Sequence, residues 1–370
     1  MTPCRPRSTT SWSRAWELPT AGSSSYKPFT VKAALELASP PTWVASIGPC
    51  CIAGAFAVCC AVQSAFVQSA SVQAGAVTGE IAGEGAGEGV GALAQVGFVL
   101  DGRSALCWAL MLLCAVLLQS AVNTLNDYQD FKSGLDTALT ILDETDASLV
   151  YNQINPRSAL AFALVLLGTA AVAGTVVLLL TSLWLFVPAA VAAAAIGLYS
   201  AGPKPISSLP LGEVVSGVVM GGVLTCVCFF ATTLSFSSAV VALAVVPTVA
   251  IAQIMQTNNT CDTARDRTAG RRTLPLIIGV RRSSMLNAAL GVFAFLWLGL
   301  FLIWEGLTPG ALVMLLGLAL CLPKLVTLLK GPYNLDNRRM MMRSVVSYNR
   351  VLDATAVIAL IVGGVARAIF

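Results

Sequence analysis

The sequence contains no histidine among its 370 residues. This absence removes the commonest zinc and haem ligand, the usual general base of enzymes, and the Ser-His-Asp catalytic triad. Any chemistry that the chain performs must therefore rely on carboxylates, amines, guanidinium groups and phenols.

Charged residues are also scarce. They make up only 11% of the chain, against 56% hydrophobic residues, and the mean hydropathy is +0.80. Soluble domains carry about 25% charged residues, so this composition indicates an integral membrane protein. A helix that crosses a bilayer needs roughly 20 apolar residues, and an open strand would leave backbone groups unpaired in lipid. The sequence therefore predicts an all-α, polytopic membrane protein, a bundle of nine transmembrane helices. The candidate spans lie at about 43–66, 105–125, 159–180, 183–199, 212–232, 238–256, 284–304, 309–329 and 348–369.

Lysine and arginine are concentrated in alternate loops. They occur in the N-terminal segment and after the second, fourth, sixth and eighth spans. The short loops after the third, fifth and seventh spans have none, and the 67–104 segment has only Arg103. The positive-inside rule then predicts a multi-pass cell-membrane protein with a cytoplasmic N-terminus and an extracytoplasmic C-terminus. Because this topology accounts for the net charge of +4, we expect no nucleic-acid partner.

Two segments outside the spans are interpreted as non-catalytic. Residues 1–32 are rich in Ser, Thr, Arg and Pro without an apolar core, which predicts a disordered cytoplasmic tail before a membrane domain at 33–370. Residues 67–101 contain "TGEIAGEGAGEGVG", whose glutamates would repel phosphate. We expect a flexible extracytoplasmic insertion there. Most of the eleven cysteines lie within spans, which favours a packing role.

Two acidic clusters follow spans that cross the membrane in the same direction. The first reads "NTLNDYQDFKSGLD" at 123–136, and the second reads "QTNNTCDTARDRTAGRRTLP" at 256–275. Both are therefore expected at the cytoplasmic face, and asparagines precede each cluster. Carboxylates at helix ends often only face water, but two such clusters in equivalent places favour a shared function.

Each cluster stacks a pair of aspartates if its helix continues past the membrane. Asp127 and Asp130 are three residues apart, and Asp262 and Asp266 are four apart, so each pair would share a helical face. Like charges stacked in this way destabilise a helix unless a cation lies between them. Mg²⁺ takes oxygen ligands, keeps several waters and completes its shell with substrate phosphates. The two pairs are thus predicted to hold Mg²⁺ on a diphosphate from both sides.

The basic residues beside the second cluster allow two interpretations. They could be topogenic charges only, or their guanidinium groups could bind the phosphate oxygens that the metal leaves free. A secondary transporter with ion-coupled carboxylates is the competing function. Its acidic groups should lie near the membrane midplane within discontinuous helices, whereas these lie at one face.

These motifs resemble those of the UbiA superfamily of intramembrane aromatic prenyltransferases, and most closely the 1,4-dihydroxy-2-naphthoate prenyltransferases of menaquinone synthesis. The first signature of that family, ND-x-x-D with a later Gly-x-Asp, is matched by Asn126, Asp127, Asp130, Gly134 and Asp136. The second is matched by Asn258, Asn259, Asp262, Asp266, Gly270, Arg271, Arg272, Thr273 and Leu274. Between them, "YSAGPKPISSLPLGE" at 199–213 resembles the family's Tyr-x-x-Gly-Pro-x-Pro loop and the Gly-Leu-Gly-Glu after it.

The resemblance covers about residues 34–370, with two departures. Cys261 stands where the naphthoate branch commonly has an arginine, which removes one expected phosphate contact. The 67–101 insertion is unusual for the family, and on the outer side it should not touch catalysis.

The resemblance implies a UbiA-like fold and a Mg²⁺-dependent transferase. A polyprenyl diphosphate would place its tail in the bundle and its diphosphate at the cytoplasmic rim. Ionisation would give an allylic cation, which the electron-rich ring of an aromatic acceptor attacks, with loss of the carboxylate when the acceptor is dihydroxynaphthoate. No obligatory protein partner is implied. Other acceptors, namely 4-hydroxybenzoate or a haem or tocopherol precursor, remain alternatives, although the Gly-x-Asp ending and the Gly-Pro-x-Pro loop favour naphthoate.

The resemblance also assigns roles to individual residues. The metal ligands are Asp127, Asp130, Asp136, Asp262 and Asp266. Residues that orient them or the metal's waters are Asn123, Asn126, Asn258 and Asn259. Diphosphate contacts are Lys204, Arg271 and Arg272. Tyr199 would flank the cation, or serve only as an interfacial anchor.

Overall fold

The computed structural model describes residues 26–78, 99–133, 148–200 and 205–370. Two of the predicted site residues, Asp136 and Lys204, lie outside these ranges, as do most of the N-terminal tail and most of the insertion. The described residues form helices joined by turns, with one isolated bridge between Lys27 and Ile154. The all-α prediction is therefore confirmed.

Each of the nine predicted spans corresponds to a helical segment of the described chain. Eight are long and apolar enough to cross a membrane, and the ninth, Leu183–Tyr199, is shorter. The segments are α2 (Val44–Thr78), α3 (Gly102–Ser133), α5 (Pro156–Leu180), α6 (Phe186–Ser200), α7 with its continuation α8 (Gly212–Ser216 and Leu224–Thr233), α9 (Ser238–Cys261), α12 (Val280–Trp304), α13 (Gly310–Lys330) and α14 (Arg338–Ile369).

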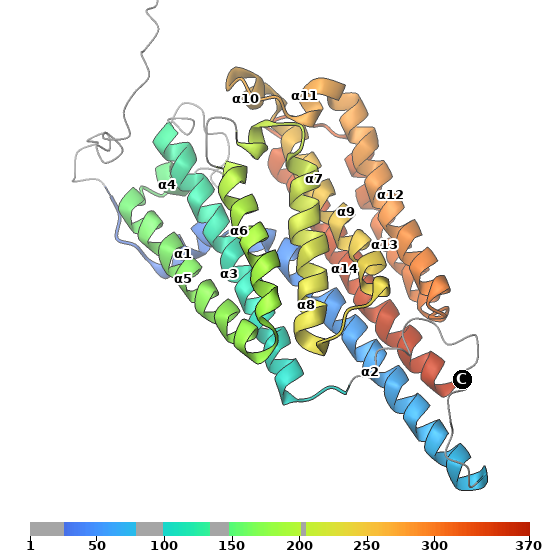
Figure 1. Ribbon diagram of the computed structural model, residues 1–370. Helices are drawn as coiled ribbons and strands as arrows, with labels where there is room; N and C mark the ends of the chain where they lie inside the picture. Colours follow the sequence, from blue (N-terminus) through green and yellow to red (C-terminus); the bar gives the residue numbers. More distant parts are fainter. Residues whose placement is uncertain (1–25, 79–98, 134–147, 201–204) are drawn as a thin grey trace, which may run out of the picture.

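Short helices gather at one end of the bundle. These are α4 (Ser148–Tyr151), α10 (Thr263–Thr268) and α11 (Leu274–Ile278), and they lie where α3 and α9 finish. The C-terminus lies at the opposite end (Figure 1). A further short helix, α1 (Val31–Ala38), packs against α3 and α5. The two acidic clusters are thus at the same end, as the sequence predicts.

The main core is an apolar cluster formed largely by α2, α8, α9, α12 and α14, with a few residues from α3, α5 and α13. Phe56 of α2 is fully buried there, with its ring centroid 5.3 Å from that of Phe229 and 5.7 Å from that of Phe301. Packed aromatic pairs of this kind add about 0.5–1.5 kcal/mol beyond their buried area. Helices α3 and α5 pack mainly against each other. This arrangement leaves space between the α3–α5 pair and the main core.

The segment between α7 and α8 is a π-helical stretch, Gly217–Val223, that packs closely on α9. A Cβ atom on Gly221 would lie 2.5 Å from the backbone of Pro247, and one on Gly217 would lie 2.5 Å from the Thr248 carbonyl oxygen. Glycine therefore permits this backbone approach. Such π turns occur frequently at functional sites, and Val219, Met220 and Val223 of this stretch line the cavity described below.

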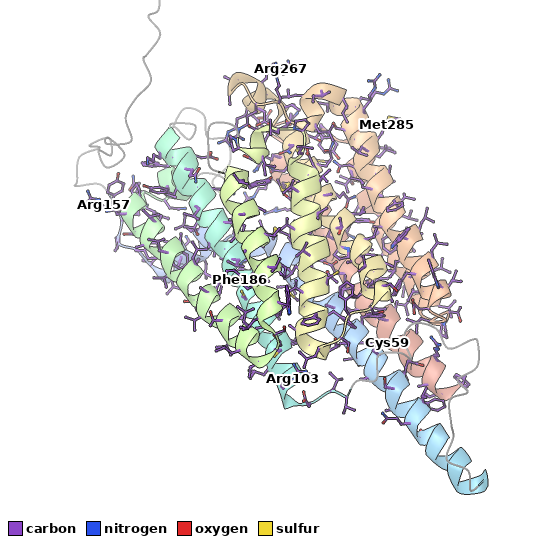
Figure 2. The ribbon with its side chains drawn as sticks, viewed as in Figure 1. Cys59, Arg103, Arg157, Phe186, Arg267 and Met285 are labelled. Carbon is purple, nitrogen blue, oxygen red and sulfur yellow. The ribbon has the colours of Figure 1, made fainter. Side chains whose placement is uncertain are left out.

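The structure explains two features of the sequence, the position of Arg103 and the many cysteines. Arg103, the exception to the charge asymmetry, donates to the carbonyl oxygens of Ala231 (3.2 Å) and Thr232 (3.0 Å). It therefore satisfies carbonyl groups at the end of α8 that lack helical partners. The ten cysteines of the described residues are free thiols, seven of them buried, in agreement with a packing role (Figure 2 labels Arg103 and Cys59).

Candidate active site

A large cavity lies between α3, α5 and α6 on one side and α8, α9 and α14 on the other. Its volume is ≈ 2220 Å³, whereas pockets for small ligands usually measure roughly 300–1,000 Å³. Along α3 it is lined from Asp130 to Met111, which at 1.5 Å per residue spans about 28 Å. Alanine, valine, leucine and glycine form most of its inner wall. The cavity can therefore hold a long apolar chain.

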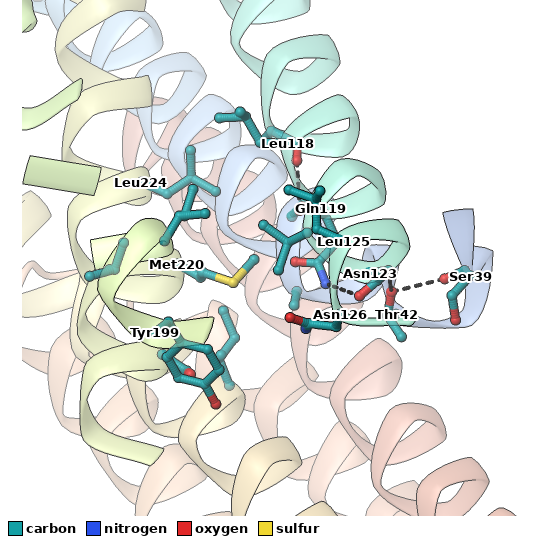
Figure 3. A pocket seen from close by; sticks show the side chains of 18 of the residues that line it. Ser39, Thr42, Leu118, Gln119, Asn123, Leu125, Asn126, Tyr199, Met220 and Leu224 are labelled. Atoms are coloured by element: carbon teal, nitrogen blue, oxygen red, sulfur yellow. Dashed lines mark hydrogen bonds between the residues drawn. The ribbon is translucent and has the colours of Figure 1, made fainter. Parts of the chain in front are cut away.

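Polar residues from both sequence motifs line the outer end of this cavity. The first motif contributes Asn123, Asn126, Asp127 and Asp130, and the second contributes Asn258, Asn259, Asp262 and Arg271. Figure 3 shows Asn123 and Asn126 of α3 opposite Tyr199 and Met220. Residues more than 120 positions apart in the chain thus lie around one polar chamber, as the Mg²⁺ hypothesis requires.

Ion pairs join the two motifs directly. Arg271 places Nη2 3.9 Å from Oδ1 of Asp130 and Nη1 3.3 Å from Oδ1 of Asp266, so one guanidinium group contacts both motifs. Arg265 Nη2 lies 3.7 Å from Asp130 Oδ2. The Asp130 pairs are partly exposed, so each stabilises the fold by only about 0–1 kcal/mol. Their significance is geometric, since they place positive charge beside the carboxylates.

Arg338, the first residue of α14, is a site residue that the sequence analysis did not identify. Its Nε lies 2.9 Å from Oδ1 of Asp262, and its Nη2 donates to Oδ1 of Asn258. The side chains of Arg338 and Asp262 are only 14% and 11% exposed. No spacing rule connects positions 262 and 338. The only sequence signal was the group of basic residues after the eighth span.

Asp266 occupies a different environment from the other motif aspartates. It is 2% exposed, accepts a hydrogen bond from Thr273 Oγ1 at 3.0 Å and does not line the cavity. Burial raises the pKa of the Asp266 carboxyl above its ordinary value, while Arg271 and Thr273 act in the opposite direction. In this structure the Asp266 carboxylate holds Arg271 at the rim of the chamber.

The expected continuation of the helices past the membrane is observed for one motif only. Helix α3 runs to Ser133 and carries Asp127 and Asp130 on successive turns. Helix α9 ends at Cys261, with Asp262 as its C-cap, and α10 begins at Thr263. A backbone hydrogen bond of 2.8 Å from Asp266 N–H to the Asp262 carbonyl preserves a helix-like spacing. The interruption allows the side chains of Asp262 and Asp266 to take separate environments.

The motif asparagines are fixed by neighbouring elements. Asn259 donates from Nδ2 to Oε1 of Glu213 at 2.9 Å, and Glu213 is only 4% exposed. Asn123 donates to Thr42 Oγ1 at 2.8 Å and accepts from Gln119 at 3.2 Å (Figure 3). Because their donors are already engaged, these side chains are held in defined orientations at the chamber.

Of the remaining predicted residues, Tyr199 lines the cavity and Arg272 does not. Tyr199 lines the cavity beside Gly212, where an added Cβ would lie 3.5 Å from the tyrosine hydroxyl. Arg272 is exposed and outside the cavity lining, and its backbone N–H donates to the Ser208 carbonyl at 2.8 Å. Cys261 is buried in an apolar cluster with Leu328 and Met341. Position 261 therefore offers no phosphate contact here.

The donor set fits a hydrated hard cation. Within the described ranges no three His, Cys, Asp or Glu side chains come close enough to form a complete metal cage. Mg²⁺ seldom uses such cages, and it is normally held by one or two carboxylates, waters and substrate phosphates. Asp127, Asp130 and Asp262 present carboxylates of this kind, and the motif asparagines line the same chamber.

Comparisons with known proteins show the family of the chain. The UbiA prenyltransferase family matches residues 90–367. A 1,4-dihydroxy-2-naphthoate octaprenyltransferase of Bacillus subtilis (strain 168) is 31% identical over 221 residues, 60% of this chain and 69% of that protein. The protein of the same name from Mycobacterium tuberculosis (strain ATCC 25618 / H37Rv) is 31% identical over 191 residues, 50% of this chain and 64% of that protein.

A solved structure shares the fold. The UbiA homolog from Archaeoglobus fulgidus bound to DMAPP and Mg²⁺ matches with a TM-score of 0.52 at 15% identity. The match covers 89% of this chain and 99% of that chain. At this identity the likeness concerns the arrangement of helices.

Proposed function

Because this chain belongs to the UbiA prenyltransferase family, it is a multi-pass membrane prenyltransferase, and we propose that it transfers a polyprenyl group from its diphosphate to 1,4-dihydroxy-2-naphthoate. The observation that carries this proposal is the single cavity in which both aspartate motifs meet at the polar end of a long apolar chamber. An amphiphilic donor matches that division, with its diphosphate at the aspartates and its tail along α3, α5 and α6. The direct product would be the hydroquinone, a demethylmenaquinol, together with CO₂ and diphosphate, and air oxidation of the hydroquinone gives the demethylmenaquinone.

We propose Asp127, Asp130 and Asp262 as the principal metal ligands. When bound, Mg²⁺ neutralises charge that develops on the leaving diphosphate. Asp136 and Asp266 stay in the proposed ligand set, although Asp266 also anchors Arg271. The A. fulgidus homolog was solved with DMAPP and Mg²⁺, which supports the same ligand classes here.

Arginines would bind the phosphate oxygens that the metal leaves free. Arg265, Arg271 and Arg338 line the cavity at the aspartate end, and a guanidinium group can form two parallel hydrogen bonds to a phosphate. Lys204 and Arg272 remain proposed contacts from the neighbouring loops. Preorganised donors aimed at developing charge are commonly the largest catalytic contribution of an enzyme site.

The remaining residues would position the reactants. Cleavage of the bond between the allylic carbon and the diphosphate oxygen gives an allylic cation, which Tyr199 flanks from the chamber wall. The electron-rich ring of the acceptor then forms the new carbon–carbon bond, its carboxylate leaves as CO₂ to restore the aromatic ring, and the donor's diphosphate departs with the oxygen of the broken bond. Glu213 keeps Asn259 oriented toward the chamber. No histidine is required in this scheme.

The choice of acceptor rests on the naphthoate relatives and on the sequence signatures. Two naphthoate octaprenyltransferases are 31% identical to this chain, and the Gly-x-Asp ending of the first motif favours the same acceptor. We also propose that residues 33–370 form the catalytic membrane domain and that the aspartate end faces the cytoplasm, in agreement with the positive-inside pattern.

An acceptor comparison tests this proposal. The purified protein in liposomes is supplied with geranylgeranyl diphosphate, Mg²⁺ and either 1,4-dihydroxy-2-naphthoate or 4-hydroxybenzoate, and products are identified by mass spectrometry. The expected result is a demethylmenaquinone from the naphthoate and little product from the benzoate. Prenylated benzoate without any naphthoate product would reassign the acceptor.

A further inference from the structure

A second hollow lies between α13 and α14 near the aspartate end of the bundle. Its volume is ≈ 510 Å³, and the two helices pack side by side over their length (Figure 1). Its charged residues are Lys324 from α13, Asp336 from the loop before α14, and Arg339 and Arg343 from α14. Three positive charges and one negative charge therefore surround it. We refer to this hollow as the α13–α14 groove.

Lys324 is an unusual residue for its position. It lies six residues before the end of α13, about 9 Å along the helix, among the exposed apolar side chains of Leu320, Leu322 and Val326. A charge in a membrane-facing helix is costly, so such a residue suggests a functional role. In the structure the ammonium group of Lys324 lies against its own helix instead of extending toward the end of α13. Its Nζ donates to the Leu320 carbonyl at 3.2 Å.

The arginines of the groove connect it with the active-site cavity. Arg339, Arg343 and Ser347 follow one another at four-residue spacing, which places them in a row along one face of α14. The same three residues line both the groove and the large cavity. The two hollows are therefore neighbours that share this polar row.

The basic residues of the groove differ from those of the chamber in their partners. Arg265, Arg271 and Arg338 are paired with motif aspartates. In the part of the chain that the structure describes, Lys324, Arg339 and Arg343 form no ion pair with a carboxylate. Their charges can thus meet an anion without first displacing a carboxylate.

We infer that the α13–α14 groove is a second binding site for a phosphorylated lipid headgroup, and that it takes the diphosphate of the prenyl donor before the donor reaches the aspartates. This inference rests on the proposed function. The donor's tail would lie against the exposed leucines of α13 while its diphosphate binds Lys324 and the two arginines. Guanidinium groups suit phosphate oxygens, and the row on α14 leads from the groove to the chamber. Asp336 offsets part of the positive charge and so favours release.

The test compares Lys324→Gln with Lys330→Gln in phosphatidylcholine nanodiscs. Lys330 is the matched control, because it is an exposed lysine of α13 that lines neither hollow. With geranylgeranyl diphosphate as the varied substrate, Lys324→Gln should lower kcat/KM for the donor about fivefold, the effect of one basic residue at a charged membrane surface. The kcat/KM for the acceptor should not fall, and Lys324→Arg should restore the donor value. Equal donor kcat/KM in Lys324→Gln, Lys330→Gln and the unchanged protein would overturn the inference.

Two further measurements distinguish failure of the groove inference from failure of the naphthoate assignment, and the prenyl donor from a membrane phospholipid. Association of the slowly ionising analogue geranylgeranyl thiodiphosphate is measured without acceptor, so slower binding to Lys324→Gln supports the groove even if the naphthoate assignment fails. Addition of phosphatidylglycerol to the nanodiscs distinguishes two possible ligands of the groove, the prenyl donor and a bilayer phospholipid. If the Lys324→Gln defect is present in pure phosphatidylcholine, the donor is the ligand. If it appears only when phosphatidylglycerol is present, the groove binds a membrane phospholipid and the proposed loading role is wrong.

Discussion

At the residue scale, aspartates of both motifs are paired with arginine. Asp130 contacts Arg265 and Arg271, and Asp262 contacts Arg338. The largely buried carboxylate of Asp262 would be costly without a compensating cation, so Arg338 stabilises the chamber, whereas the partly exposed Asp130 pairs contribute little. If these carboxylates bind Mg²⁺ as proposed, the guanidinium groups would become available for phosphate oxygens. The same residues would thereby serve the free and the loaded states.

Substitution of a motif aspartate tests its role as a ligand. Asp127→Asn and Asp262→Asn keep side-chain size but remove a ligand charge, and we expect each to lower the rate of prenyl transfer ~10²–10³-fold. Asp143→Asn is the control, because Asp143 matches neither motif. All three variants should insert into the membrane normally. Motif variants that keep more than about a tenth of the normal rate would place these aspartates away from the metal.

Substitution of Arg338 tests whether its guanidinium group and Mg²⁺ compete for the Asp262 carboxylate. Without metal, Arg338→Gln should unfold at a lower temperature than the unchanged protein, because it leaves Asp262 uncompensated at a cost of up to about 3 kcal/mol. Added Mg²⁺ should raise the Tm of the variant more than that of the unchanged protein, since no arginine competes for the carboxylate.

Thermal unfolding in detergent, with and without Mg²⁺, measures both effects. Arg282→Gln is the matched control, because Arg282 is exposed and lines neither hollow in the described structure. An Mg²⁺ response of Arg338→Gln no larger than that of the control would contradict the exchange.

The residues of the site were predictable only where a motif marks them. Asp127, Asp130, Asn258 and Asp262 belong to short patterns with fixed spacing, and the structure places all four at one cavity. Arg338 belongs to no such pattern. Its contact with Asp262 depends on how α14 packs beside α9, which is a property of the folded bundle and not of local sequence.

At the element scale, apolar runs in the sequence predict where the helices lie. They do not predict where a helix is interrupted or changes its hydrogen-bond pattern. The runs predicted all nine segments, because length and composition decide whether a helix can cross a bilayer. The π-helical stretch at Gly217–Val223 and the end of α9 before Asp262 were not predicted. The π-helical stretch packs against a distant segment, with Gly221 against Pro247.

Alanine at Gly221 tests the close contact of this stretch with α9. The added methyl group would lie 2.5 Å from the Pro247 backbone, so we expect Gly221→Ala to lower stability by about 1–3 kcal/mol. Gly168→Ala on α5 is the matched control, since an added Cβ there meets nothing within 4 Å. Chemical unfolding followed by tryptophan fluorescence compares the two, and equal stability would show that the contact is unimportant.

At the scale of the whole molecule, the fold combines a packed apolar core with an adjacent chamber. Helices α2, α8, α9, α12 and α14 share the apolar core, and α3, α5 and α6 close the cavity from the other side. The aspartates lie at one end of this chamber, and the apolar wall extends away from them. Separation of a polar end from an apolar interior allows one bundle to hold a diphosphate and a lipid tail together.

The central claim is that the two motifs act through a divalent metal on the diphosphate of a prenyl donor. The most direct measurement is prenyl transfer by the protein in liposomes, with geranylgeranyl diphosphate and 1,4-dihydroxy-2-naphthoate, before and after exhaustive EDTA treatment. The account predicts that product formation is lost with EDTA and returns on addition of excess Mg²⁺. Full turnover after EDTA treatment would contradict it.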